Sequence, residues 1–244
     1  MYPGPAPLLV LLGIPGIAAL LVALFVFANR RAAQCLRFTR DAVRRRTFVA
    51  ALLVLGWCTL WGGLAGGGVL AQFDWRPPPL ALFVATVVAG SIALGASRFA
   101  EPLAHGLPLA GLVGFQAFRL PLELVMHEAA DAGVMPSVLS FSGWNFDIVT
   151  GTLAIPVAAL VAHGRAARWL VPAWNTLGLA ALTVIAGIAI GSAPFIQAFG
   201  PQQVNRWVAY LPFVYLPGVM VAAAIVGHVL VIRSLRQAAR STSR

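Results

Sequence analysis

Four polar residues stand three or four positions apart inside an otherwise apolar stretch, FQAFRLPLELVMHE. They are Gln116, Arg119, Glu123 and His127. On a helix this spacing places all four side chains on one face. A guanidinium and a carboxylate one turn apart can neutralise each other, and such a pair either stabilises a fold or binds a polar ligand or a proton. The stretch therefore predicts a buried charged stripe, and its role stays open.

A second polar group follows in the segment SGWNFDIVTG. Asn145 and Asp147 stand there at the expected start of a helix. One interpretation is local: Ser142 or Asn145 caps the helix, and Asp147 interacts with its positive end. The other interpretation joins Asn145 and Asp147 to Arg119 and Glu123 in one buried network. The sequence alone supports both.

Prolines predict irregular backbone close to these polar residues. Pro121 lies between the two charges of the stripe and has no amide hydrogen to donate to the carbonyl of Ala117, so we expect a local kink. A freed carbonyl beside charged groups is a place for water or a polar ligand. Pro212 and Pro217 likewise predict a bent or unwound start of the last apolar segment.

Several of these segments resemble the motifs of a known family of membrane proteins. FRLPLE and FSGWNFDIVTG, with YLPFVYLPG and His228 further along, resemble an uncharacterised family of bacterial multispan integral membrane proteins. The family has an F-R-x-x-x-E motif, a G-x-N-F-D-I signature and a Pro-rich last helix. The resemblance covers the C-terminal half of the chain, and Trp144 departs from it where a basic residue is expected. It implies no activity, but it implies that the polar positions of the family are Arg119, Glu123, Asn145, Asp147 and His228.

The composition predicts that these residues lie in a membrane. The chain has 244 residues, of which 60% are hydrophobic and 10% charged, whereas soluble domains have about a quarter charged residues. All 17 basic residues are arginine, and a protein without lysine cannot form a retinal Schiff base. The arginines are not interleaved with stacking aromatic residues, so no nucleic-acid partner is predicted.

Apolar runs long enough to span a bilayer predict seven transmembrane helices. They cover residues 8–28, 48–73, 80–97, 108–127, 147–163, 171–192 and 210–232. We therefore predict an all-α polytopic membrane protein, with one transmembrane helical domain over residues 1–244 that ends in a short basic tail, 233–244. The first run has no basic flank or cleavage site, so we expect a permanent helix rather than a removed signal.

The arginines also predict the orientation. They collect in the first, third and fifth loops and in the tail, and loops rich in arginine stay in the cytoplasm. We predict an extracytoplasmic N-terminus and a cytoplasmic C-terminus in the bacterial plasma (inner) membrane. Membrane lipids are the expected partners. The glycines Gly62, Gly63, Gly66 and Gly67 fit close helix packing inside the bundle or a face for dimerisation.

The histidines are the weak candidates for a cofactor. His105, His163 and His228 are expected near the inner ends of their segments, and His127 near the outer face. A haem needs two facing imidazoles, and a zinc site needs three or four converging ligands. No spacing of His or Cys predicts either, so no cofactor and no metal are predicted, although the inner histidines leave haem or metal open.

Together these patterns favour a membrane protein that binds or conducts a small polar solute, an ion or a proton through an outward-facing polar cavity. The candidates for the ligand or proton site are Arg119, Glu123, Asn145, Asp147, Gln116 and His127. A membrane-bound enzyme or redox subunit, an accessory subunit of a larger membrane complex and a homo-oligomer stay open. The sequence has no Walker A, H-E-x-x-H or G-x-S-x-G motif, and no catalytic residue is predicted.

Overall fold

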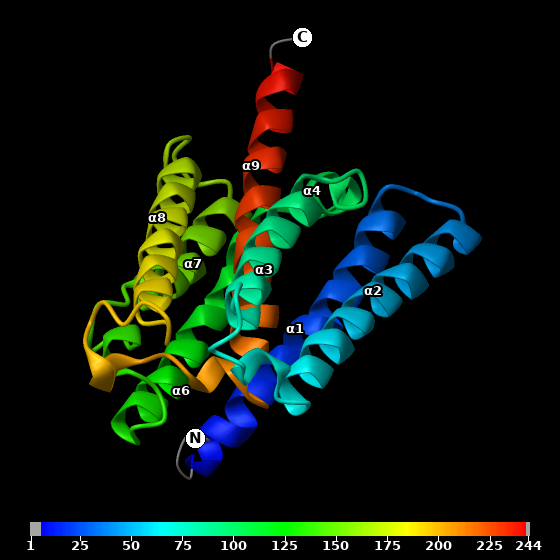
Figure 1. Ribbon diagram of the computed structural model, residues 1–244. Coiled ribbons are helices and arrows are strands. Elements are labelled where there is room, and N and C mark those ends of the chain that lie inside the picture. Colours follow the sequence, from blue (N-terminus) through cyan, green and yellow to red (C-terminus); the bar gives the residue numbers. More distant parts are fainter. Residues whose placement is uncertain (1–5, 243–244) are drawn as a thin grey trace.

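The computed structural model describes residues 6–242 and is built from helices joined by short turns and loops (Figure 1). The longer helices are α1 (Leu8–Cys35), α2 (Arg40–Gly66), α3 (Pro79–Ala96), α6 (Arg119–Asp131), α7 (Asp147–Ala162), α8 (Leu170–Gly191) and α9 (Ala222–Thr242). The short ones are α4 (Glu101–Gly106) and α5 (Leu109–Gly114), a π-helical segment Leu216–Val221, and 3-10 segments at Val69–Ala71, Phe115–Phe118, Ser137–Leu139, Pro201–Gln203 and Trp207–Ala209. No strand occurs within residues 6–242.

Six helical segments are long and apolar enough to cross a membrane. They are α1, α2, α3, the continuous segment Leu109–Asp131, α8, and Leu216–Arg240. The predicted fifth span corresponds to α7, which is apolar but has only 16 residues. At about 1.5 Å per residue, α7 is about 24 Å long, which is shorter than the hydrocarbon core of a typical bilayer, about 30 Å. The all-α fold is confirmed, and six candidate spans are compatible with a multi-pass membrane protein.

Several boundaries differ from the predicted ones. Both α1 and α2 extend past their apolar runs toward the turn that joins them, because polar residues continue the helices there. At its other end α2 stops at Gly66, since Gly68 adopts a φ of 72° that breaks the helix. The predicted basic tail continues as part of α9 as far as Thr242, and residues 243–244 lie outside the described part of the chain.

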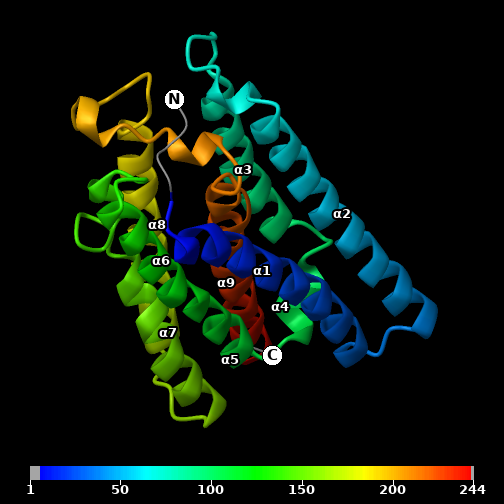
Figure 2. The ribbon, with the colours of Figure 1, turned by 90° about the horizontal axis from the view of Figure 1, so that it is seen from below.

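The last helix lies at the centre of the bundle. α9 packs against α3, α4, α5 and α8, while α7 packs against α5, α6 and α8 (Figure 2). The α1–α2 hairpin joins this group mainly through α1, which contacts α4 and α6. Gly62 and Gly66 of α2 face Tyr215 and Leu211, so these two glycines serve packing inside the bundle. The arrangement brings α6, α7, α8 and α9 together around the polar stripe.

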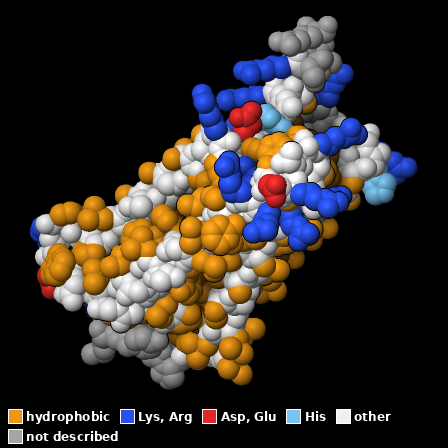
Figure 3. Space-filling view, turned by 90° about the vertical axis from the view of Figure 1, so that its right-hand side faces the viewer, with side chains coloured by type: hydrophobic (Ala, Val, Ile, Leu, Met, Phe, Trp, Pro, Cys, Tyr) orange, Lys and Arg blue, Asp and Glu red, His pale blue; other side chains and the backbone are white. Residues whose placement is uncertain are grey.

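Arginine side chains gather at one end of the molecule, and hydrophobic side chains cover much of its body (Figure 3). This end holds the α1–α2 turn, the α7–α8 turn and the C-terminal end of α9, and the N-terminus lies at the opposite end (Figure 1). The arginine-rich segments that are far apart in the sequence therefore lie at the same end of the bundle.

Candidate functional site

The backbone changes its helical form directly before the polar residues. The segment Phe115–Phe118 is a 3-10 turn, and α6 then begins at Arg119. Pro121 thus falls in the first turn of α6, where a missing amide hydrogen disturbs a helix least. The irregularity predicted from Pro121 is present, and it lies in the turn before the proline.

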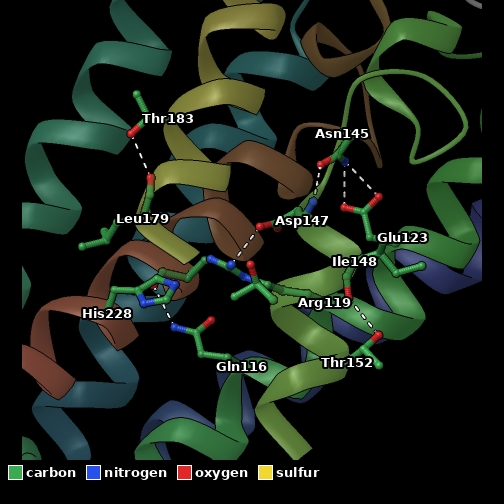
Figure 4. A network of polar contacts seen from close by, with 12 residues as sticks. Gln116, Arg119, Glu123, Asn145, Asp147, Ile148, Thr152, Leu179, Thr183 and His228 are labelled. Atoms are coloured by element: carbon green, nitrogen blue, oxygen red, sulfur yellow. Dashed lines mark hydrogen bonds and ion pairs between the residues drawn. The ribbon is translucent and has the colours of Figure 1, made fainter. Parts of the chain in front are cut away.

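Arg119 forms the central ion pair of the site. Its side chain is 1% exposed, and its Nη1 donates to Oδ1 of Asp147 at 2.8 Å (Figure 4). Asp147 is the first residue of α7, and a carboxylate is favoured at the positive end of a helix. The spacing in the sequence predicts Glu123 as the partner of Arg119. In the structure the guanidinium of Arg119 instead pairs with Asp147, because the start of α7 packs directly against Arg119.

A glycine makes this close approach of α7 to α6 possible. A Cβ atom added at Gly151 would lie 2.9 Å from the Cβ of Arg119 and 2.9 Å from the backbone nitrogen of Leu120. Real Cβ atoms do not come so close to backbone, so any larger residue at position 151 pushes the two helices apart. Gly151 therefore helps to hold Asp147 within reach of Arg119.

The carboxylate of Glu123 accepts hydrogen bonds from a side-chain amide and not from a cationic group. Its side chain is 2% exposed, and Nδ2 of Asn145 donates to its two carboxylate oxygens at 2.8 and 2.9 Å. The same nitrogen also lies 3.1 Å from the carbonyl oxygen of Leu139. The other side-chain atom, Oδ1 of Asn145, accepts from the backbone N–H of Asp147 at 3.0 Å. Asn145 thus connects the two carboxylates, as the network interpretation predicts. The N-cap of α7 is Phe146 and no side chain caps the helix, so the interpretation of Ser142 or Asn145 as the cap is wrong, whereas Asp147 does lie at the start of the helix.

The two remaining predicted site residues lie apart from these carboxylates. Gln116 is buried and donates from Nε2 to the carbonyl oxygen of Ala224 in α9 at 3.0 Å. His127 is about one third exposed in its side chain, with Nδ1 3.2 Å from the hydroxyl of Ser140 and Nε2 3.5 Å from Asp131. The structure therefore brings Arg119, Glu123, Asn145 and Asp147 into one network and leaves His127 on α6 beside Ser140, outside this network.

The three inner histidines do not converge. His105 lies 3.8 Å from Glu101, and His163 is exposed, with Nδ1 2.7 Å from the carbonyl oxygen of Ala159. His228 is fully buried, with Nδ1 2.8 Å from Oδ1 of Asn175. His228 is therefore enclosed within the bundle, unlike the other two, because its face of α9 packs against α8. Within residues 6–242, no group of three or more His, Cys, Asp or Glu is placed to hold a metal ion.

Sequence reasoning missed Asn175 and Thr150, which lie beside the network. Asn175 orients His228, and the backbone carbonyl of Thr150 accepts from Nε1 of Trp174 at 3.2 Å. Several buried polar atoms nearby have no hydrogen-bond partner within the described chain. They are Nε and Nη2 of Arg119, Oγ1 of Thr150, Oε1 of Gln116 and Nε2 of His228. The sequence signal that could have indicated Asn175 is its own position, a single asparagine in the apolar run of α8.

A small cavity adjoins the network. It has a volume of about 40 Å³ and is lined by Arg119, Glu123, Asn145 and Asp147, with apolar side chains of α6, α8 and the π-helical segment on its other sides, and it is partly open. A buried water needs about 10–15 Å³ of such volume, so the cavity has room for about three water molecules. The π-helical segment Leu216–Val221 forms one wall, and such segments occur often at functional sites.

No protein-family model, curated protein or solved structure matches this chain. The resemblance to the bacterial membrane-protein family therefore stays a prediction, and a function has to be argued from the geometry of the site.

Proposed function

We propose that this chain is a multi-pass protein of the bacterial inner membrane whose buried polar network binds and conducts protons, with Glu123 as the group that takes up and releases the proton. Arg119, Asn145 and Asp147 hold Glu123 in place, and the small cavity supplies the water through which the proton moves. The observation that carries the proposal is a charge imbalance. The network contains two buried carboxylates but one guanidinium, and that guanidinium is paired with Asp147.

The imbalance follows from the contacts. Arg119 and Asp147 form a neutral pair at 2.8 Å. Glu123 is also buried, and within residues 6–242 no cationic nitrogen lies within ion-pair distance of it. An uncompensated charge inside a membrane protein is costly, by at least about 2.5–3.5 kcal/mol on insertion scales. A proton on Glu123 removes that cost. A carboxyl group that is buried without a cationic partner is therefore suited to take up and release a proton.

The size of the cavity favours a proton over a larger solute. Its volume of about 40 Å³ holds a few waters, whereas sites for organic ligands have volumes of about 300–1,000 Å³. The space therefore fits water and a proton or a small ion, and the unpaired carboxyl group of Glu123 favours the proton.

The positions of the chain ends support seven crossings of the membrane with the N-terminus outside. The described chain begins at one end of the bundle and finishes at the other (Figure 1), as an odd number of passes would give. The six long spans and α7 together provide seven. Because arginine-rich ends stay in the cytoplasm, the C-terminus is inside. The first turn of α7 and its Asp147 then belong to the outer half, which places the cavity toward the outside.

A flux assay tests the proposal. The purified protein is reconstituted in liposomes that contain a pH-sensitive dye, and a potassium diffusion potential drives proton entry. We expect acidification with the native chain and its loss in Glu123→Gln. Glu128→Gln removes an exposed carboxylate from the same helix and is expected to leave the flux unchanged. Flux that persists in Glu123→Gln, or none above empty liposomes with the native chain, contradicts proton conduction.

The other function classes have less support. A haem or metal redox subunit needs converging ligands, and His105, His163 and His228 have separate surroundings. An accessory role would use an outward small-residue face of α2. Gly62 and Gly66 pack against Tyr215 and Leu211, which leaves only Gly63 and Gly67 of the four glycines for such a face.

A further inference from the structure

A large apolar cavity lies on the other side of the bundle from the polar network. Its volume is about 540 Å³, which is within the range of about 300–1,000 Å³ that is typical of sites for organic ligands. It is bounded by α1, α2, α3, α5 and α9. The side chains that shape it include Phe25, Leu53, Trp57, Leu94, Leu112 and Val226.

The cavity exists because α2 and α3 pack against different helices. α2 packs along α1, whereas α3 packs along the central α9. The two helices are tied together near the Val69–Ala71 segment, which contacts both. Trp57 adds a second anchor, since its Nε1 donates to the carbonyl oxygen of Gly218 at 2.7 Å. At the arginine-rich end the hairpin is held as well, because α1 packs against α4 and Arg46 donates to the carbonyl of Phe99. The cavity is the space left between α2 and α3 between these two sets of contacts.

The chemistry of the walls determines what can fill this space. The walls are almost entirely apolar and the space is open on one side rather than enclosed, so a site of this kind between membrane-spanning helices borders on lipid chains. Ser91 is a polar residue of the wall, but its hydroxyl donates to the carbonyl of Val87 at 2.6 Å, so its hydrogen is not available to a ligand. The body of the cavity therefore selects a hydrocarbon chain.

One charged residue stands at the arginine-rich end of the cavity. Of the described residues that line it, only Arg31 is charged. The Arg31 side chain is exposed, and within residues 6–242 it forms no ion pair or hydrogen bond. By contrast, the nearby Arg46 is engaged by Asn29 and by the carbonyl of Phe99. A free guanidinium next to a hydrocarbon site complements the phosphate of a lipid headgroup.

We propose that the cavity between α2 and α3 binds an anionic phospholipid, with one acyl chain inside the cavity and the phosphate at Arg31. The acyl chain contacts Trp57 and Gly90 at the far end of the cavity. This site is separate from Glu123, and its occupation does not depend on the proposed proton function.

Native mass spectrometry of the purified full chain tests the headgroup contact. The protein is delipidated in detergent and then titrated with phosphatidylglycerol or with zwitterionic phosphatidylethanolamine. We expect tighter retention of phosphatidylglycerol, and a loss of this preference by about tenfold or more in Arg31→Gln, which corresponds to about 1.4 kcal/mol. Arg30→Gln removes the same charge from the neighbouring position outside the cavity and should keep the preference.

A second pair of variants tests the acyl-chain site. A Cβ at Gly90 meets only the ring of Trp57, at 3.7 Å, so Gly90→Leu is expected to fold and to fill the cavity. We expect it to lower the number of retained lipids per chain. Gly56→Leu makes the same change where a Cβ meets nothing within 4 Å and should retain the lipid.

Three results would overturn the proposal. One is equal retention of phosphatidylglycerol in Arg31→Gln and Arg30→Gln. Another is equal retention in Gly90→Leu and Gly56→Leu, which assigns the lipid to the outer surface. The third is a neutral apolar molecule or a helix of another protein in the cavity of the purified native chain. Melting temperatures of the variants close to that of the native chain show that lost binding is not lost folding.

Discussion

Asn145 donates its side-chain amide to both carboxylate oxygens of Glu123, at 2.8 and 2.9 Å, although 22 positions separate the two residues in sequence. The carbonyl oxygen of the same side chain accepts from the backbone N–H of Asp147. One neutral residue therefore determines where both buried carboxylates lie. Its position between α6 and the start of α7 makes Asn145 the most informative residue for tests of the network.

Replacing Asn145 by alanine is expected to destabilise the protein. The change leaves the oxygens of Glu123 and the carbonyl of Leu139 without their donor, and buried unsatisfied groups cost about 1–3 kcal/mol. Denaturant unfolding in detergent should show a loss of this size for Asn145→Ala and a larger one for Asn145→Asp, which adds a third carboxylate. Gln202→Ala, at an exposed position, is the control. Equal stability of Asn145→Ala and the control would show that the amide contributes nothing.

The ion pair between Arg119 and Asp147 is expected to behave as a coupled unit. Removal of one partner of a buried pair costs about 3–5 kcal/mol, because it leaves the other charge unpaired. Arg119→Met and Asp147→Leu should each lower the free energy of unfolding by about this amount, and the double variant by much less than the sum. A double-mutant cycle measures the coupling. Strictly additive losses would mean that the two charges do not interact.

Close packing at Gly178 is expected to be sensitive to a single methyl group. A Cβ there would overlap the ring of His228 and lie 2.8 Å from Cγ2 of Thr150. Gly178→Ala should therefore destabilise the protein by about 1–3 kcal/mol, the usual cost of overpacking. Gly187→Ala lies in the same helix, where a Cβ meets nothing within 4 Å, and should be neutral or stabilising. Thermal unfolding measures the difference in stability between the two variants. Equal melting temperatures of Gly178→Ala and Gly187→Ala would contradict the prediction.

The native cysteines offer a test of the proposed orientation. Cys35 is exposed at the C-terminal end of α1, next to the arginine-rich turn, and Cys58 is partly buried within α2. A membrane-impermeant maleimide should label Cys35 only after the inner membrane has been permeabilised. A cysteine introduced at Gln202, in a variant that lacks Cys35 and Cys58, should be labelled in intact spheroplasts. Labelling of Cys35 from outside would reverse the orientation.

The sequence predicts local features of this protein better than contacts between helices. The helical spacing of Arg119 and Glu123 indicates their common face, because an α-helix has a fixed period. Their actual partners could not be predicted in the same way. Asp147 lies 28 positions from Arg119, and its approach depends on the packing of α7 against α6 at Gly151.

The placement of His228 shows the same limit. Its partner, Asn175, lies 53 positions away on α8, and an apolar segment gives little sign of which face turns inward. Both α8 and α9 are apolar around these residues, so periodicity does not distinguish lipid-facing from protein-facing sides. The cavity beside Arg119 depends on the π-helical form of Leu216–Val221, which the prolines indicate only as an irregularity.

The protonation of Glu123 is the central claim, and infrared difference spectroscopy measures it directly. Protonated carboxyl groups absorb separately from carboxylates, so a titration of the detergent-solubilised protein should show a band of a buried neutral carboxyl group. The account predicts that this band is present in the native chain and in Glu128→Gln and is missing in Glu123→Gln. Absence of the band from the native chain at every pH, or its persistence in Glu123→Gln, would contradict the account.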